Sequence, residues 1–301
     1  MTRPDGGTSE LADDRPTYPL EHVLELPDGR HAEWEAIGDG PPLLWIEGGP
    51  GLPAHLARPE ARLIAARFRC HLVNAPGCGR STPPRAPDGY GLDDHVRYFD
   101  DVRRALGLGA VTLMGHSFGG LVAIALALAV PEAVERLIII SGHAGEASVP
   151  EDVAAAEREI ALDRQRHQPW FTKAVATFDE DLDITSRELD EHFETCWPLY
   201  FADPDSPASK EHIARLRRET RWNIDAARAW TPEPPLDLLP ELGRIRCPTL
   251  VVAGEHDFIC GPSWNRPIAA AIPNAIYEEI RGVGHFPEYE APEEFRRVVL
   301  D

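Results

Sequence analysis

The residues with the clearest chemical potential surround one serine, in the stretch LMGHSFGG from Leu113 to Gly120. Ser117 is flanked by Gly115 and Gly119, between an apolar run and a helical stretch of small residues. A Gly-x-Ser-x-Gly segment between a strand and a helix indicates a nucleophile elbow, whose tight turn lifts the serine hydroxyl above the sheet. Side chains at the flanking positions would collide with neighbouring backbone, which explains the glycines. We therefore predict a catalytic nucleophile at Ser117; the alternative is a Gly/Ser turn without chemistry.

A serine hydroxyl needs a base to take its proton, usually a histidine that a carboxylate orients. With this type of elbow the order along the chain is serine, then Asp or Glu, then His. Asp257 and His285 each follow a predicted strand in that order, so both lie where ligands bind in open α/β sheets. We predict that Asp257 orients His285, which deprotonates Ser117 and later protonates the leaving group.

Other polar residues lie close to these positions. Glu255 and His256 immediately precede Asp257 and are its rivals, and surface loops often carry such residues for solubility alone. His116 is next to the nucleophile, but the elbow should point its side chain elsewhere. We interpret His116 as a structural neighbour rather than as the base.

The tetrahedral intermediate of acyl transfer needs amide donors. A predicted strand over 43–46 runs into the loop EGGPG, residues 47–51, which can turn its amides toward the serine. We predict an oxyanion hole formed by the amides of Gly49 and Phe118, the latter at a helix N-terminus whose dipole is positive. The alternative is an ordinary Gly-Pro turn.

The predicted elements that must position these residues alternate between strands and helices. The LPDGR sequence at 26–30 indicates a hairpin turn between the first two strands, and the later strands, separated by helix-length segments, imply a parallel sheet. Short apolar or alternating runs predict the strands Glu21–Leu26, Ala32–Ile37, Leu43–Ile46, Cys70–Val73, Val111–Met114, Leu137–Ile140, Thr249–Ala253 and Ile276–Ile280.

The alternation stops between residues 145 and 243, where no strand pattern occurs. Helical patterns cover 151–168, 186–200 and 207–222, and the proline-rich TPEPPLDLLPEL then returns the chain toward the sheet. We predict a core formed by residues 1–144 and 244–301, with residues 145–243 as a helical cap over the open sheet.

Composition excludes several classes of partner. The 301 residues carry a net charge of −20, which disfavours nucleic acid and anionic membranes. No apolar run reaches membrane-spanning length, and the polar N-terminus lacks the pattern of a signal peptide and predicts a loose arm, so a cytoplasmic location is expected. The five cysteines are far apart and are expected to be free thiols, with no metal and no cofactor implied; the oligomeric state stays open.

Taken together, the chain resembles the α/β-hydrolases over nearly its whole length, and more narrowly the proline iminopeptidase family of serine peptidases. The likeness rests on EGGPG (47–51) against the family's HGGPG, on NAPGCGRS (74–81) against its D-Q-R-G-x-G-x-S, and on the LGL–elbow segment, cap and late histidine loop. Glu47, Asn74 and Pro76 depart from those motifs, and the elbow reads GHSFGG rather than a GGS type. The resemblance implies a mostly parallel central sheet with helices on both faces and a helical cap.

The resemblance also implies that acidic groups, largely from the cap, hold the free amine of the substrate. One such acid can lie beside the catalytic aspartate, where this chain has Phe258. In the late cap segment RWNID, Asp225 is the first candidate for this role and Trp222 a further substrate-binding candidate; Glu47 is the second acidic candidate. Alternatively, Asp225 only pairs with Arg221 or Arg228 on a helix surface, and Glu47 only braces its loop.

Three functions follow. The first is a hydrolase that releases an N-terminal amino acid from a small peptide or amide, as the peptidases do, or an aminoacyl group from a biosynthetic intermediate, as some of their relatives do. The second is an esterase or lactonase with the same triad. The third is a triad-bearing receptor for a small molecule with little turnover. Epoxide hydrolase and dehalogenase chemistry are disfavoured, because those enzymes place an aspartate at the elbow.

Overall fold

The computed structural model describes residues 16–86, 89–180, 186–230 and 234–300. Its centre is an 8-stranded sheet in the order β1-β2-β4-β3-β5-β6-β7-β8, and every strand expected from the sequence is present. The strands are β1 (His22–Glu25), β2 (His31–Ile37), β3 (Pro42–Ile46), β4 (Arg69–Val73), β5 (Val111–His116), β6 (Val134–Ile140), β7 (Thr249–Gly254) and β8 (Ala275–Ile280).

The strand directions also agree with the prediction. The first two strands pair antiparallel, and the amide of Leu26 donates to the carbonyl of Arg30 at 2.8 Å across the predicted hairpin turn. β2 also pairs antiparallel with β4, whereas the strands from β4 to β8 in the sheet order all run parallel to one another. The carboxyl ends of β3, β5, β7 and β8 therefore meet at one edge, which is the edge that carries the predicted catalytic residues.

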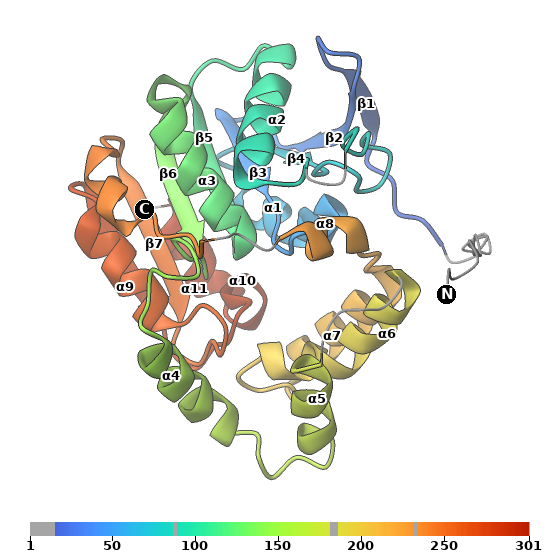
Figure 1. The fold of residues 1–301 in the computed structure, drawn as a ribbon, viewed down its shortest axis with the longest axis vertical. Coiled ribbons are helices and arrows are strands. Elements are labelled where there is room, and N and C mark those ends of the chain that lie inside the picture. Colours follow the sequence, from blue (N-terminus) through green and yellow to red (C-terminus); the bar gives the residue numbers. More distant parts are fainter. Residues whose placement is uncertain (1–15, 87–88, 181–185, 231–233, 301) are drawn as a thin grey trace, which may run out of the picture.

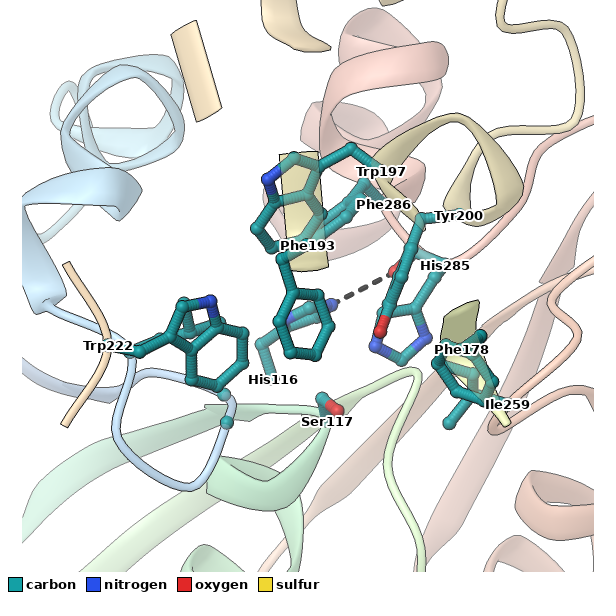
Figure 2. A pocket seen from close by; sticks show the side chains of 13 residues that line it. His116, Ser117, Phe178, Phe193, Trp197, Tyr200, Trp222, Ile259, His285 and Phe286 are labelled. Atoms are coloured by element: carbon teal, nitrogen blue, oxygen red, sulfur yellow. Dashed lines mark hydrogen bonds between the residues drawn. The ribbon is translucent and has the colours of Figure 1, made fainter. Parts of the chain in front are cut away.

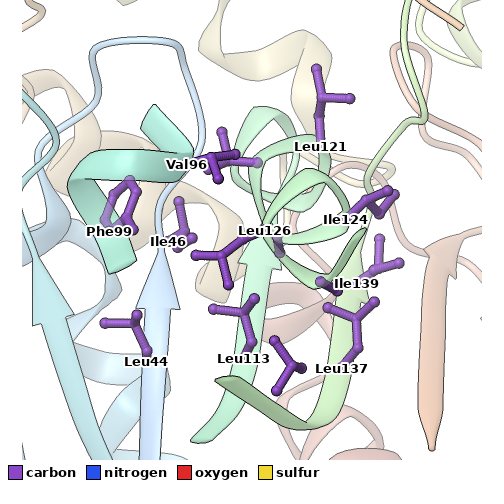
Figure 3. Close-up of a cluster of buried hydrophobic side chains, with 14 of the residues drawn as sticks. Leu44, Ile46, Val96, Phe99, Leu113, Leu121, Ile124, Leu126, Leu137 and Ile139 are labelled. Carbon is purple, nitrogen blue, oxygen red and sulfur yellow. The ribbon is translucent and has the colours of Figure 1, made fainter. Parts of the chain in front are cut away.

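Helices cover both faces of the sheet (Figure 1). Because side chains of a strand alternate between faces, Leu44 and Ile46 join the buried cluster under the helices α2 (Leu92–Ala105), α3 (Phe118–Ala129) and α9 (Pro262–Ala271) (Figure 3). Leu43 and Trp45 point the other way, into a second cluster with α1 and α11. The core helices are α1 (Arg58–Ile64), α2 (Leu92–Ala105), α3 (Phe118–Ala129), α9 (Pro262–Ala271), α10 (Pro287–Glu290) and α11 (Pro292–Leu300), with 3-10 turns η1 (Ala54–Ala57), η2 (Pro131–Ala133) and η4 (Leu239–Arg244).

Between β6 and β7 the described residues form helices and no strand, as expected. The helix predicted over 151–168 ends earlier, at Asp163. Two short helices, α5 (Phe171–Phe178) and α8 (Ile224–Ala229), were not predicted, because each is too brief for a clear helical period. Residues 231–233 of the proline-rich return lie outside the described residues. The cap elements are α4 (Glu151–Asp163), α5 (Phe171–Phe178), α6 (Ser186–Cys196), η3 (Trp197–Tyr200), α7 (Pro207–Glu219) and α8 (Ile224–Ala229).

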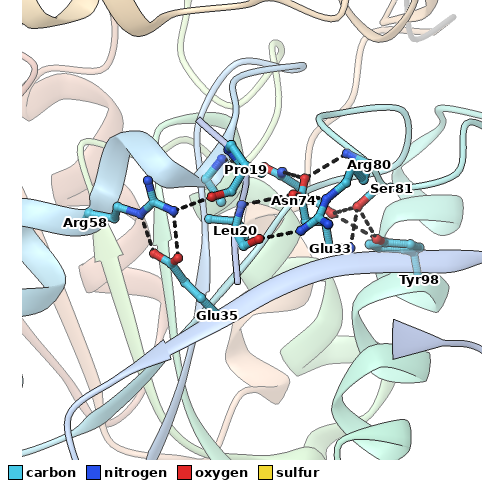
Figure 4. Close-up of polar contacts among 10 residues, drawn as sticks. Pro19, Leu20, Glu33, Glu35, Arg58, Asn74, Arg80, Ser81 and Tyr98 are labelled. Carbon is cyan, nitrogen blue, oxygen red and sulfur yellow. Dashed lines mark hydrogen bonds and ion pairs between the residues drawn. The ribbon is translucent and has the colours of Figure 1, made fainter. Parts of the chain in front are cut away.

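A buried polar cluster joins β2 to the loop after β4 (Figure 4). The carboxylate of Glu33 is fully buried and accepts hydrogen bonds from the side chains of Asn74 at 2.8 Å and Arg80 at 2.6 Å. The Asn74 amide oxygen in turn accepts from the Ala54 amide at 2.7 Å. A Cβ on Gly79 would lie 2.1 Å from the Glu33 carboxylate, so glycine is required there. Asn74 thus anchors the loop that follows EGGPG.

Two further expectations bear on the described residues. The five cysteines are all free, as predicted from their spacing. In the part of the chain that the structure describes, no helix combines the length and apolarity needed to cross a membrane. The predicted N-terminal arm lies largely in residues 1–15, outside the described residues.

Candidate functional site

The turn between β5 and α3 has the geometry expected of a nucleophile elbow. Ser117 has φ 53° and ψ −122°, a left-handed conformation that non-glycine residues rarely adopt. A Cβ on Gly115 would lie 2.1 Å from the Gly119 carbonyl oxygen, and one on Gly119 would lie 2.2 Å from the Ile46 carbonyl oxygen. Both contacts are prohibitive, which confirms the steric reason predicted for the two glycines.

The structure brings the predicted acid and base together across the sheet edge. Asp257 Oδ2 and His285 Nδ1 are 2.8 Å apart. Both residues are buried, with only 1% of the surface of Asp257 and 3% of that of His285 exposed to solvent. The other oxygen, Asp257 Oδ1, accepts from the amides of Ile259 at 2.9 Å and Cys260 at 3.1 Å. Because the carboxylate can only accept, His285 carries a proton on Nδ1 and its Nε2 is left as the basic nitrogen.

Burial and charge shift the pKa of both groups in the directions that general-base catalysis needs. Burial raises the pKa of Asp257, but the neighbouring His285 and the hydrogen bonds outweigh it, so the pKa lies below its usual range. Burial lowers the pKa of His285, Asp257 opposes that change, and the net pKa is lowered. At neutral pH this favours an ionised Asp257 beside an uncharged His285.

The backbone of His285 is held from two sides. Its amide donates to the Tyr200 carbonyl oxygen of the cap at 2.8 Å. Its carbonyl oxygen accepts from His116 Nε2 at 2.9 Å, the dashed line in Figure 2. The histidine loop is therefore positioned by one contact from the cap and one from the elbow, and the sequence predicted neither.

The EGGPG loop approaches the serine closely. A Cβ on Gly48 would lie 3.2 Å from the Cβ of Ser117 and 3.3 Å from His116 Nδ1, so a side chain there would crowd the nucleophile. The Gly48 amide donates to Glu47 Oε1 at 3.0 Å, so this amide already has an acceptor and is not one of the predicted oxyanion donors. The amides of Gly49 and Phe118 stay the predicted oxyanion donors, and Gly49 lines the same cavity as Ser117.

A cavity of about 240 Å³ opens above Ser117, with a mostly apolar wall. Figure 2 shows Phe193 and Trp222 on one side of the serine and Phe178 on the other, with the Tyr200 hydroxyl directed down toward His285. Among the described residues, no Asp, Glu, Lys or Arg lines it. The lining residues are Gly48, Gly49, Leu52, His116, Ser117, Phe178, Phe193, Trp197, Tyr200, Trp222, Ile259, His285 and Phe286.

The structure separates the three predicted substrate-binding residues. Trp222 lines the cavity. Asp225 is exposed in the first turn of α8, where its amide donates to the Asn223 side chain at 3.1 Å, and it does not reach the cavity wall. Glu47 is largely buried beside His116, with Oε1 3.5 Å from Nδ1, and its carboxylate is likewise not part of the wall. Neither acid is placed to meet a substrate amine in this cavity.

Sequence reasoning did not single out the aromatic residues of the cap that line the cavity, which are Phe178, Phe193, Trp197 and Tyr200. They come from α5, α6 and η3, and ring contacts link them, as in the 5.3 Å pair of Phe193 with Trp197. A concentration of aromatic residues in a predicted cap was the available signal.

Among the rivals of Asp257, Glu255 instead points outward, and its Oε2 accepts from the Gly282 amide at 2.8 Å.

Comparison with known proteins places the chain in a family. A model of the alpha/beta hydrolase fold family matches residues 41–292, so the chain belongs to that family. An alpha/beta fold family hydrolase from Bacillus anthracis has the same architecture, with a TM-score of 0.73 at 20% sequence identity over 93% of this chain and 98% of the other. The fold expected from the resemblance is thus confirmed.

The similar curated proteins differ in activity. The chain is 29% identical over 257 residues to a 2-hydroxy-6-oxononadienedioate/2-hydroxy-6-oxononatrienedioate hydrolase from Dechloromonas aromatica, covering 84% of this chain and 83% of the other. It is 24% identical over 301 residues to a proline iminopeptidase from Heyndrickxia coagulans, covering 93% and 97%. It is 30% identical over 284 residues to polyketide synthase ThaQ from Burkholderia thailandensis, of whose length the match spans 12%, with 92% of this chain covered. These likenesses support a hydrolase and leave its substrate open.

Proposed function

We propose that the protein is a serine hydrolase that cleaves uncharged carboxylic esters or lactones with short apolar acyl groups, through an acyl-enzyme on Ser117. The observation that carries this proposal is the wall of the cavity above Ser117, which is aromatic and aliphatic and to which no described carboxylate, ammonium or guanidinium contributes. A volume of about 240 Å³ is below the roughly 300–1,000 Å³ of typical ligand pockets, which favours a small substrate.

The charge of the substrate decides between the candidate functions. An ion that loses its water without gaining a partner costs several kcal/mol or more. A free ammonium needs a carboxylate, and Asp225 and Glu47 both lie outside the wall. A dioate, the substrate class in the name of the Dechloromonas relative, needs a cationic partner, and none of the described wall residues is Lys or Arg. An uncharged acyl group needs neither an anionic nor a cationic partner, so it can enter the cavity without the free-energy cost of burying an unpaired ion.

The proposed reaction begins with proton transfer from the Ser117 hydroxyl to His285 Nε2. The serine oxygen attacks the ester carbonyl, and Asp257 stabilises the imidazolium that forms. The negative charge that develops on the carbonyl oxygen is met by the Gly49 and Phe118 amides and by the positive end of α3. His285 then protonates the departing alcohol, which leaves an acyl group on Ser117.

The second half of the reaction repeats these roles with water. A water molecule enters where the alcohol left, and His285 removes its proton as it attacks the acyl carbonyl. The tetrahedral intermediate collapses, the carboxylic acid is released, and the proton returns to Ser117.

An aminopeptidase is the second candidate function. It is favoured by the EGGPG loop beside Ser117 and by the likeness to the Heyndrickxia coagulans proline iminopeptidase. The same triad and oxyanion amides would serve an amide bond. This function requires an acidic partner for the substrate amine in the cavity, and the two candidates predicted from the sequence lie elsewhere.

A matched set of aryl esters tests the proposal. The 4-nitrophenyl esters of butyric acid, succinic acid and alanine have acyl groups of similar size that are neutral, anionic and cationic at pH 7. We expect kcat/KM for the butyrate to exceed that for either charged ester by about 100-fold or more, which corresponds to about 2.7 kcal/mol.

The other functions give different results in the same assay. Preference for the alanine ester over the butyrate, together with hydrolysis of alanine or proline 4-nitroanilide that N-acetylation abolishes, would identify an aminopeptidase. Preference for the succinate ester would identify a hydrolase of anionic substrates. Saturable binding of the esters without steady-state turnover would identify the receptor.

A further inference from the structure

His116, the residue just before the proposed nucleophile, has partners that the mechanism above does not use. Its imidazole is buried, with 2% of the residue exposed. The ring centroid lies 4.8 Å from that of His285 and 5.1 Å from that of Phe286, on which it stacks. Both ring nitrogens face protein groups rather than the open cavity. Any contribution of His116 to the reaction must therefore pass through its neighbours.

The contacts of the two nitrogens determine the charge of the ring. Nε2 lies 2.9 Å from the His285 carbonyl oxygen, which can only accept, so Nε2 carries a proton. Nδ1 lies 3.5 Å from Glu47 Oε1. In a neutral ring, Nδ1 would turn a lone pair toward that carboxylate, whereas a protonated Nδ1 forms an ion pair with it. Glu288 Oε1 lies 4.0 Å from Nε2, and a negative charge at this carboxyl group also favours a cation.

The same contacts connect the loops that carry the proposed chemistry. Glu47 Oε1 accepts from the Gly48 amide at 3.0 Å, in the loop of the predicted oxyanion hole. His116 is in the elbow beside Ser117, and its Nε2 proton binds the backbone of His285. The ion pair thus connects the ends of β3 and β5, and the hydrogen bond of His116 adds the loop after β8.

We infer that His116 is a positioning residue, held as a buried cation by Glu47, that fixes the His285 backbone and keeps the His285 imidazole uncharged. The inference rests on the proposed function in one respect, which is that the proposed function makes His285 the general base. A positive charge within about 4–6 Å disfavours a second positive charge on a neighbouring group. His285 is therefore maintained in the form that can accept the serine proton.

The pKa directions agree with this geometry. Burial alone would lower the pKa of His116, but Glu288 and Glu47 outweigh it and raise the pKa to about 9. The pKa of Glu47 is lowered, because His116 outweighs the effect of its burial. The pKa of Glu288 is raised to about 7 by burial, against the effect of His116. At neutral pH the cation and the Glu47 anion therefore coexist.

Other titratable groups also face this cluster. Asp257 and Glu47 raise the pKa of His285, against its burial and the His116 charge, and His143 also interacts electrostatically with His285. Glu290 and Glu47 raise the pKa of Glu288, and Glu288 in turn adds to the effect of burial that raises the pKa of Glu60. His116 is the neighbour whose positive charge lowers the pKa of His285, with the ring centroids 4.8 Å apart, so removal of His116 is the specific perturbation.

The test is a titration by NMR of the full-length protein, with ¹⁵N in the imidazole rings. His116→Gln keeps a donor for the His285 carbonyl and removes the charge, and the missing signals of this variant and of His285→Gln assign the two rings. We expect both nitrogens of His116 to be protonated at pH 7 in the wild type. We expect the pKa of His285 to rise by about one unit or more in His116→Gln.

Two further variants keep the test decisive. His71→Gln replaces another buried histidine, on β4 and outside this cluster, and should leave the pKa of His285 unchanged. Glu47→Gln removes the anion and should lower the pKa of His116 by about one unit or more. If His116→Gln fails to fold, the inference is tested by the protonation state of His116 in the wild type and by the pKa of His116 in Glu47→Gln.

The titration needs no substrate, so it is independent of the ester assay. A wild-type His116 with one unprotonated nitrogen at pH 7, or a His285 pKa that is the same in His116→Gln, would overturn the inference even if esters are hydrolysed. Conversely, the expected shifts in a protein that does not hydrolyse esters would leave the inference standing and remove the proposed function. Where turnover is present, the acid limb of kcat/KM should move to higher pH in His116→Gln, in step with the pKa of His285.

Discussion

The floor and the roof of the cavity are built from different chemistry. The floor comes from the carboxyl ends of β3, β5, β7 and β8 and carries polar groups with specific contacts, as in the 2.8 Å contact of Asp257 with His285. The roof comes from the cap, which contributes aromatic rings such as those of Phe193 and Trp222, stacked at 4.3 Å. The two meet where the His285 amide donates to the Tyr200 carbonyl oxygen.

This contrast suggests a division of labour. Strand ends of a sheet are rigid, and rigid elements hold reacting groups more accurately than loops do. The cap carries apolar surface, and under the proposed function this surface selects substrates by their shape and disfavours charged ones. Substitutions in the floor should therefore alter the rate for every substrate, whereas substitutions in the roof should alter the order of preference among substrates.

The largest effect is expected in the floor, from Ser117→Ala. Removal of the nucleophile should reduce kcat for the butyrate ester by about 10⁴- to 10⁶-fold, with an unchanged thermal unfolding midpoint, because alanine relieves rather than adds steric demand at this position. Retention of a tenth of the activity would show that Ser117 is not the nucleophile. The double variant with His285→Ala should lose little more, because these groups act as a unit.

Asp257→Asn should have the next largest effect, a loss of about 10⁴-fold in kcat. The asparagine can donate to His285 Nδ1 and so favours the wrong tautomer, which leaves no basic Nε2. Glu255→Gln is the matched control, because this nearby carboxylate binds the Gly282 amide instead. A large loss in the control with little loss in Asp257→Asn would reverse the assignment of the acid.

In the roof, Phe193→Ala should change selectivity rather than chemistry. The substitution enlarges the cavity beside Trp222, so kcat/KM for the octanoate ester relative to the acetate ester should rise by about tenfold. Val153→Ala, on an exposed face of α4, is the control and should leave the ratio unchanged. An equal loss on both esters would mean that Phe193 supports the floor instead of shaping the acyl site.

The smallest expected effect concerns the wild-type pH profile. Because burial and His116 lower the pKa of His285, the base stays uncharged to lower pH than a free imidazole of pKa about 6.5. The acid limb of kcat/KM should therefore have its midpoint below about pH 6.5. A midpoint above that value would indicate that the Asp257 charge, which raises the pKa, dominates the site.

Much of the floor could be predicted from the sequence, because its signals are local. Each strand is a short apolar or alternating run, and the elbow needs glycine at two fixed offsets from Ser117. The order of serine, acid and histidine along the chain then singled out Asp257 and His285, which the structure places in contact. The triad itself stays a prediction until the variants above are measured.

The roof and the brace behind the histidine were decided by tertiary structure alone. The cavity wall combines rings from α5, α6, η3 and the segment before α8, and no local pattern shows which faces of short helices turn inward. Asp225 has the sequence context of a binding residue, yet α8 places it in solvent. His116 becomes the partner of Glu47 and Glu288 only because β3, β5 and the loop after β8 end side by side. Local sequence specifies strands and turns through sterics and hydrophobic period, whereas the charge and selectivity of the site depend on contacts between distant segments, which only packing brings together.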